Sequence, residues 1–169
     1  RDDVYGAQPG DGYSAMVGGV KMVSTEAQAS LFGGKPVGTI PHALIAALGG
    51  DTVKATKRFA ETIEGVDVIA LVDYDNDCVK SSLEVARALE DRLWGVRLDT
   101  SEHMVDKSVF SQMGVFKPTG VNANLVWNVR NALDTEGFGD VKIIVSGGFD
   151  AERIAEFEED GVPVDAYGV

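Results

Sequence analysis

Cysteine and histidine are scarce in this sequence of 169 residues, which contains one cysteine, Cys78, and two histidines. A single cysteine cannot form a disulfide within the chain, and no spacing typical of zinc ligands is present. This composition suits a reducing compartment, so we expect a cytoplasmic protein. The N-terminal residues show no signal-peptide pattern.

Long hydrophobic runs are also missing. The longest is Val66–Val72, and Asp67 interrupts it. A membrane-spanning helix needs about 20 consecutive apolar residues, so we expect no membrane association.

Basic residues are outnumbered, with 15 Lys and Arg against 27 Asp and Glu and a formal net charge of −12. Such a surface repels the phosphate backbone of nucleic acids, which excludes DNA and RNA as expected partners. One small phosphate group can still be bound, because backbone N–H groups bind anions without a net positive charge.

The sequence does contain a regular alternation of short apolar runs and amphipathic stretches. The predicted strands are Pro36–Ile40, Val68–Val72, Val96–Leu98, Val141–Val145 and Val164–Tyr167. Five helices are predicted. The first follows Ser24 and Thr25 and ends at Gly33, the second is capped by Asp51 or Thr52, and the last is capped by Asp150. The third has an apolar stripe from Val79 to Leu93 and stops at Gly95, and the fourth has one from Leu125 to Leu133 and stops at Gly137. Residues 1–20 predict a connection or a partial strand, and 99–120 an irregular excursion.

Strands that alternate with helices at this spacing indicate a parallel α/β sheet, either open and doubly wound or closed into a barrel. In both architectures ligands bind at the carboxyl ends of the strands, so the residues that follow each apolar run are the candidates. They are His42, Asp73, Asp99, Thr100, Ser146, Gly147, Gly148 and Gly168, together with Arg97 inside the run Val96–Leu98.

Each candidate also has an ordinary structural interpretation. Ser146-Gly147-Gly148 can be a plain turn before a helix or a loop whose N–H groups bind phosphate. Arg97 can be an ordinary paired residue between strand and helix. Alternatively, its guanidinium can bind phosphate while Asp99 accepts hydrogen bonds from ribose hydroxyls. His42, taken alone, is more often a hydrogen-bonded structural residue.

The run Asp73-Tyr74-Asp75-Asn76-Asp77 has the carboxylate spacing of a calcium-binding EF-hand loop. The sixth position, however, is Cys78 rather than glycine, and a strand rather than a helix precedes the run. We therefore favour helix capping for Asp75 and Asp77, and a site role for Asp73.

Taken together, six stretches resemble the nicotinate phosphoribosyltransferases, which are type II phosphoribosyltransferases. They are Gly38–Ile45, Gly50–Thr52, Ala70–Asp73, Gly95–Thr100, Val145–Gly148 and Val164–Val169, and they follow the family's order from about residue 17 to the end.

The resemblance implies an irregular, TIM-like parallel α/β barrel packed on an N-terminal domain, with an active site shared across a homodimer. Residues 1–169 are then one partial catalytic domain, a fragment without the N-terminal domain and the C-terminal continuation, and inactive alone. The implied reaction joins nicotinate to phosphoribosyl pyrophosphate in NAD biosynthesis, giving nicotinate mononucleotide and pyrophosphate, coupled to ATP hydrolysis and dependent on Mg²⁺.

The resemblance also implies residue roles. His42 matches the histidine that ATP phosphorylates. Asp73, Arg97 and Asp99 match residues that bind ribose, phosphate and pyrophosphate, with Asp73 and Asp99 as magnesium ligands. Ser146, Gly147 and Gly148 match one phosphate-binding loop together with Thr100, and Gly168 begins another.

Other functions remain open at this stage. A related transferase could use nicotinamide or quinolinate, although quinolinate enzymes need several basic residues for two carboxylates and no phosphohistidine. A non-catalytic metal-binding module built on Asp73, Asp75 and Asp77 is the alternative from a different class.

Overall fold

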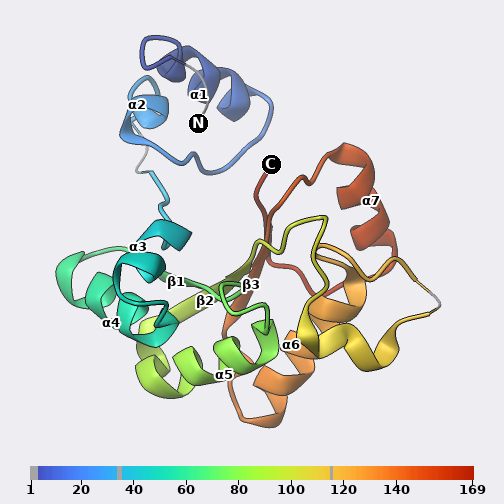
Figure 1. Ribbon diagram of the computed structural model, residues 1–169. Coiled ribbons are helices and arrows are strands. Elements are labelled where there is room, and N and C mark those ends of the chain that lie inside the picture. The colour runs from blue at the N-terminus through green and yellow to red at the C-terminus, as the bar shows by residue number, and fades with distance from the viewer. Residues whose placement is uncertain (1–3, 34–35, 115) are drawn as a thin grey trace. The chain divides into compact units, whose positions relative to one another are not determined.

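In a computed structural model that describes residues 4–33, 36–114 and 116–169, the chain clusters into two compact units, Arg1–Gly38 and Thr39–Val169. The second unit contains the whole α/β part (Figure 1). The single catalytic domain expected over residues 1–169 therefore stays a prediction, and each unit is described by itself.

The first unit is helical. Helix α1 spans Gln8–Val17 and α2 spans Glu26–Ala29, with the Thr25 side chain accepting from the N–H of Gln28 at the start of α2. The connection or partial strand predicted for residues 1–20 is thus wrong where the structure describes it, and residues 1–3 lie outside that part. The glycines that obscured the helix include Gly12, where a Cβ would lie 2.1 Å from the backbone oxygen of Gln28. Glycine at this position lets the two helices approach closely.

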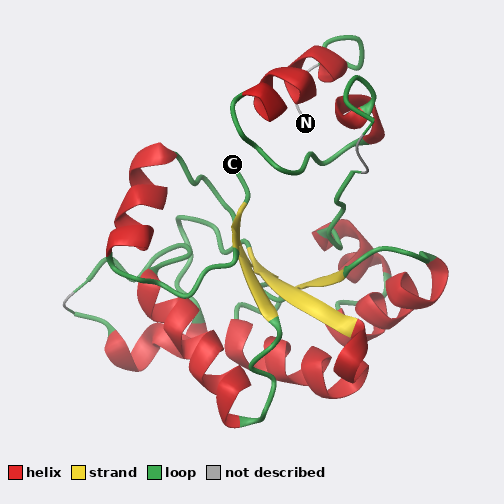
Figure 2. Cartoon of the chain, turned by 180° about the vertical axis from the view of Figure 1, so that it is seen from behind, coloured by secondary structure: helices red, strands yellow, loops and turns green. Residues whose placement is uncertain are grey.

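The second unit consists of a parallel sheet with helices packed against it, as Figure 2 shows from behind. Its elements follow in this order: α3 (His42–Ala47), α4 (Thr52–Thr62), β1 (Val68–Leu71), α5 (Cys78–Leu89), a 3-10 turn (Glu90–Arg92), β2 (Leu93–Leu98), a 3-10 helix (Lys107–Gln112), α6 (Ala123–Thr135), β3 (Lys142–Val145), α7 (Ala151–Glu159) and β4 (Ala166–Tyr167). The strands are hydrogen-bonded in the order β1-β2-β3-β4, and every pair is parallel.

Two predicted elements differ clearly from the observed ones. Pro36–Ile40 is not a strand, and His42 instead begins α3. The predicted helix with its Val79 to Leu93 stripe ends at Leu89, because Leu93 already begins β2. Gly95 therefore lies inside a strand and does not terminate a helix.

Both faces of the sheet are buried, which explains the continuous apolar run at β1. Val68, Ala70 and Val72 belong to the main core, which also contains the inner sides of α5 and α6. Leu71 belongs to a second cluster with Ile40 and Ile45 on the α3 side.

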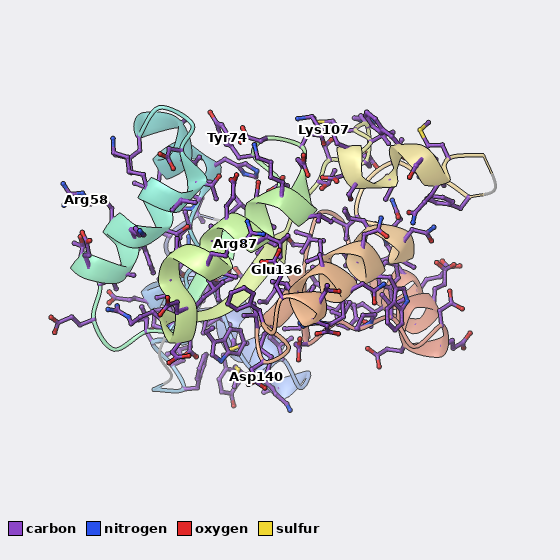
Figure 3. The ribbon with its side chains drawn as sticks, turned by 90° about the horizontal axis from the view of Figure 1, so that it is seen from below. Arg58, Tyr74, Arg87, Lys107, Glu136 and Asp140 are labelled. Atoms are coloured by element: carbon purple, nitrogen blue, oxygen red, sulfur yellow. The ribbon has the colours of Figure 1, made fainter. Side chains whose placement is uncertain are left out.

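The helices cover one face in sequence order, since α4 packs on β1 and α5, and α5 packs on β2 and α6. On the outer side, Arg87 of α5 pairs with Glu136 at the end of α6, and Lys107 donates to the backbone oxygen of Asp75 (Figure 3). Exposed pairs of this kind contribute little to stability, so the packed faces determine how these helices lie.

Gly95 gives a stability prediction, because a Cβ there would lie 2.9 Å from both Ile144 Cδ1 and the backbone oxygen of Lys142. We expect Gly95→Ala to lower the free energy of unfolding by about 1–3 kcal/mol through overpacking. The control is Gly139→Ala, whose Cβ would meet only Asp134 Oδ1 at 3.5 Å. Urea unfolding of both variants checks this, and equal midpoints would contradict it.

Candidate active site

The carboxyl ends of the four strands carry the polar residues that the sequence singled out. Backbone pairing continues one residue past the strands: Val72 donates to Arg97, Ser146 donates to Leu98, and Gly168 donates to Val145. These hydrogen bonds fix the residues that follow each strand relative to one another. Asp73, Asp99, Ser146 and Gly168 therefore begin their loops from adjacent, rigid positions.

Arg97 is the centre of a hydrogen-bonded network at these strand ends. Its register partners are Leu71 on β1 and Ile144 on β3, so a guanidinium leaves the sheet between two aliphatic side chains. Its Nε donates to Ser146 Oγ at 2.8 Å and its Nη2 to Asp99 Oδ2 at 2.7 Å. Its Nη1 donates to Thr39 Oγ1 at 2.6 Å.

Ser146 closes the network, because its hydroxyl lies 2.6 Å from Asp99 Oδ1 and 3.2 Å from the backbone oxygen of Leu98. The side chains of Arg97 and Asp99 are 18% and 20% exposed, so their charges are only partly hydrated and interact strongly. Three predicted site residues from two strands thus converge. The role of Thr39 gave no signal in the sequence beyond its place in the Gly38–Ile45 stretch.

His42 and Asp73 form a second pair at the same end of the sheet. His42 Nε2 lies 3.0 Å from Asp73 Oδ2, and their side chains are 48% and 8% exposed. His42 reaches this position as the first residue of α3, with Pro41 as the preceding cap residue, and not from the end of a strand. One imidazole nitrogen is therefore fixed by a carboxylate.

The surroundings of the Asp73 carboxyl disfavour its charged form. Burial raises the pKa of its carboxyl above the ordinary value of 3.8, His42 opposes this through a hydrogen bond and its charge, and Asp99 adds to the rise. The second oxygen, Oδ1, is buried and has no hydrogen-bond partner within the described part of the chain. A buried carboxylate oxygen without a donor is suited to receive a cation or a ligand hydroxyl.

The glycine-rich turn after β3 lies beside this network. Gly147 and Gly148 have φ values of +90° and +80°, a conformation that side chains rarely adopt. A Cβ on Gly147 would lie 3.6 Å from Asp99 Oδ1, and one on Gly168 would lie 3.1 Å from Ser146 Cβ. The two predicted phosphate loops therefore start against each other and against Asp99.

Thr100 is placed differently from the other candidates. Its side chain is buried, and its hydroxyl lies 3.7 Å from Cys78 Sγ, so it faces the core. Only the backbone oxygen of Thr100 lies near Gly147. Phosphate binding by its hydroxyl stays a prediction without a supporting contact. Burial also raises the pKa of the Cys78 thiol, which keeps it protonated and unreactive.

The carboxylates after β1 do not form a calcium loop. Asp77 caps α5 by accepting from the N–H of Lys80, and the backbone oxygen of Asp75 accepts from Lys107. Within the described ranges, no group of three or more His, Cys, Asp or Glu side chains could hold a metal ion.

Magnesium requires less of the protein, since Mg²⁺ commonly takes one or two carboxylates and completes its shell with water and substrate phosphates. Asp73 and Asp99 fit this pattern, because they lie close enough to interact electrostatically and Asp73 Oδ1 has no donor.

Arg153 is a residue that the sequence interpretation missed. It lies on α7, and its guanidinium donates to the backbone oxygens of Gly147 and Gly148. Arg153 is a half-buried polar residue inside a helix, and no sequence pattern distinguishes it as a site residue.

Comparison with known proteins bears on the fold of the chain. No protein-family model matches the chain. The chain is structurally similar to nicotinate-nucleotide pyrophosphorylase from Pyrococcus furiosus. The two share 40% sequence identity with a TM-score of 0.74, and the match covers 92% of this chain. It covers 36% of that protein, so the chain spans little more than a third of its neighbour's length.

The similarity confirms the predicted class of fold, a parallel α/β arrangement like that of a type II phosphoribosyltransferase. In the part of the chain that the structure describes, no helix is both long enough and apolar enough to span a membrane.

Asp73 leads to a prediction about stability and pH. Because its folded-state pKa is raised, the native state binds more protons than the unfolded state as the pH rises from 3.8, and stability falls through that window. Asp73→Asn removes the buried charge and can still accept from His42. We expect this variant to be more stable than wild type near pH 7, with a difference that shrinks toward acid pH. Urea unfolding at several pH values measures it, and a less stable variant at neutral pH would contradict it.

Proposed function

We propose that this chain forms part of a type II phosphoribosyltransferase that joins a pyridine carboxylic acid to phosphoribosyl pyrophosphate. The observation that supports this most strongly is the network of Arg97, Asp99 and Ser146 at the strand ends, beside the Gly147-Gly148 turn. The 40% identity to a nicotinate-nucleotide pyrophosphorylase supports the same class of reaction.

The proposed reaction is a displacement at the anomeric carbon of the ribose. The pyridine nitrogen attacks the anomeric carbon with its lone pair, a new C–N bond forms, and the C–O bond to pyrophosphate breaks. No general base is required, but the leaving group must be neutralised and the developing positive charge on the ribose tolerated.

In this proposal Arg97 and the N–H groups of the turn that follows Ser146 bind phosphate oxygens, and the loop that begins at Gly168 binds further ones. Asp99 accepts from ribose hydroxyls and Asp73 lies near the cationic sugar. Mg²⁺ held by Asp73 and Asp99 would neutralise charge on the leaving pyrophosphate.

Two pyridine acids compete as the substrate. The neighbour's name favours quinolinate, because nicotinate-nucleotide pyrophosphorylases belong to the quinolinate phosphoribosyltransferases. Nicotinate is favoured by the resemblance of the sequence to the nicotinate phosphoribosyltransferases, and its single carboxylate needs fewer basic residues than the two carboxylates of quinolinate. Nicotinamide lacks a carboxylate and is supported by neither observation.

ATP coupling belongs to the nicotinate version of the proposal. His42 is the acceptor proposed for the phosphoryl group, because Asp73 fixes its Nε2 and leaves the other ring nitrogen available. Assembly as a homodimer also stays a prediction.

The test is to incubate the complete protein with phosphoribosyl pyrophosphate, Mg²⁺ and each pyridine in turn. Nicotinate mononucleotide formed from nicotinate, with ATP stimulation, supports the first version. The same product from quinolinate, with release of its 2-carboxylate as CO₂, supports the second. If neither acid is consumed, the proposed function is wrong.

A further inference from the structure

Arg153 has an unusual set of partners for an arginine. Its Nη1 donates to the backbone oxygens of Gly147 at 3.1 Å and Gly148 at 3.3 Å. Its Nη2 donates to the backbone oxygen of Val121, and its guanidinium lies 4.1 Å from the ring centre of Phe149. One side chain thus links the turn after β3 to the end of the long segment that follows β2.

The contacts of Arg153 orient the peptide groups of the turn. In a trans peptide the C=O of one residue points opposite to the N–H of the next, and the described residues contain no cis peptide bond. Since the oxygens of Gly147 and Gly148 point at Arg153, the N–H groups of Gly148 and Phe149 point away from it. Neither N–H group donates a hydrogen bond within the described part of the chain.

The guanidinium also has no salt-bridge partner among the described residues. Among the described residues, no carboxylate lies within salt-bridge distance of Arg153, in contrast to Arg97 with Asp99 and Arg130 with Asp134. Its partners are neutral carbonyls and an aromatic ring. A full positive charge therefore remains directly behind the turn, in a half-buried position where screening by water is reduced.

We propose that Arg153 is a positioning residue for anion binding by the Gly147-Gly148 turn. It holds the two carbonyls back, so that the N–H groups of Gly148 and Phe149 stay available for phosphate oxygens, and its charge adds to the attraction. It does not touch the phosphate. This inference rests on the proposed function, and it adds a specific residue and a physical role to the site.

The variants are Arg153→Ala, Arg153→Gln and Arg153→Lys in the complete protein. Arg153→Ala should raise KM for phosphoribosyl pyrophosphate and the Kd for pyrophosphate by about tenfold or more, with a smaller change in kcat. Arg153→Gln keeps a donor without the charge, and Arg153→Lys keeps the charge without the planar fork, so each should recover part of the loss. Guanidinium ion added at millimolar concentration should partly restore Arg153→Ala.

Arg130 provides the matched control, because it performs the same backbone task at the opposite end of β3. It donates to the backbone oxygens of Val141 at 2.7 Å and Phe138 at 3.0 Å. Arg130→Ala should lower stability by a similar amount and leave KM for phosphoribosyl pyrophosphate and the Kd for pyrophosphate unchanged.

The outcomes separate the two proposals. If wild-type protein transfers phosphoribosyl groups but Arg153→Ala and Arg130→Ala affect KM and the Kd for pyrophosphate equally, Arg153 is only structural and the inference is wrong. If wild-type protein neither transfers phosphoribosyl groups nor binds pyrophosphate, the proposed function itself has failed. A selective loss of anion affinity in Arg153→Ala, with partial recovery in Arg153→Lys, supports the inference.

Discussion

Arg97→Ala is expected to lower kcat/KM for phosphoribosyl pyrophosphate by about 10²-fold or more in the complete enzyme, because a charge-assisted fork to phosphate would be lost. The structure adds a second reason for a large effect. Arg97 holds both Asp99 and Ser146, so its removal leaves a half-buried carboxylate without its cation and a loop serine without its donor. Steady-state kinetics with phosphoribosyl pyrophosphate as the varied substrate provides the measurement.

The matched control is Arg92→Ala, because Arg92 directly precedes the first residue of β2. Arg92 also donates to an oxygen, the backbone carbonyl of Ala60, but lies at the amino end of the strands. We expect Arg92→Ala to lower the free energy of unfolding and to leave kcat/KM for phosphoribosyl pyrophosphate unchanged. Unchanged kinetics for Arg97→Ala would remove Arg97 from the site.

His42→Ala is expected to abolish ATP stimulation while some ATP-independent transfer remains. Asp73 fixes His42 Nε2, and the exposed ring is accessible to a phosphoryl donor. Incubation of wild-type protein with γ-labelled ATP should give an acid-labile, base-stable label, and His42→Ala should give none. Asp73→Asn should label more slowly, since a neutral amide supports the imidazole less well than a carboxylate does.

His103 is the natural control, because it is the second of the chain's two histidines and its side chain is 84% exposed beside Glu102. His103→Ala should label and respond to ATP like wild type. If wild-type protein takes no label and ATP does not stimulate transfer, the coupling role of His42 is wrong, and the quinolinate version of the proposed function gains support.

The α/β part of the fold could be predicted because its signals are local. The capping residues Asp51, Asp77 and Asp150 each accept from a backbone N–H in the first turn of their helices. The buried strands appear as short apolar runs because both faces of the sheet are covered. Since parallel strands end at one edge, the positions of Arg97, Asp99 and Ser146 followed from the strand boundaries.

The errors arise where a residue serves tertiary packing. The sequence predicts a helix stop at Gly95, but the residue is a glycine because Ile144 and Lys142 of the neighbouring strand leave no room for a side chain. Gly12 obscured α1 for the same kind of reason. The partners of Thr39 and Arg153 are distant in sequence, and Thr39 and Arg97 are 58 positions apart. No local periodicity can predict such contacts.

The Gly147-Gly148 turn has a consequence for how the protein responds to acidity. The groups proposed to bind anions there are backbone amides supported by an arginine, and neither gains nor loses a proton between mildly acidic and mildly alkaline conditions. Any pH dependence of phosphate binding at this turn would then come from the phosphate itself, whose second pKa lies at about 6. The carboxyl with the raised pKa lies elsewhere, at Asp73. The turn and the proton-sensitive carboxyl are therefore separate parts of one strand-end surface, and the turn keeps its own charge when the pH changes.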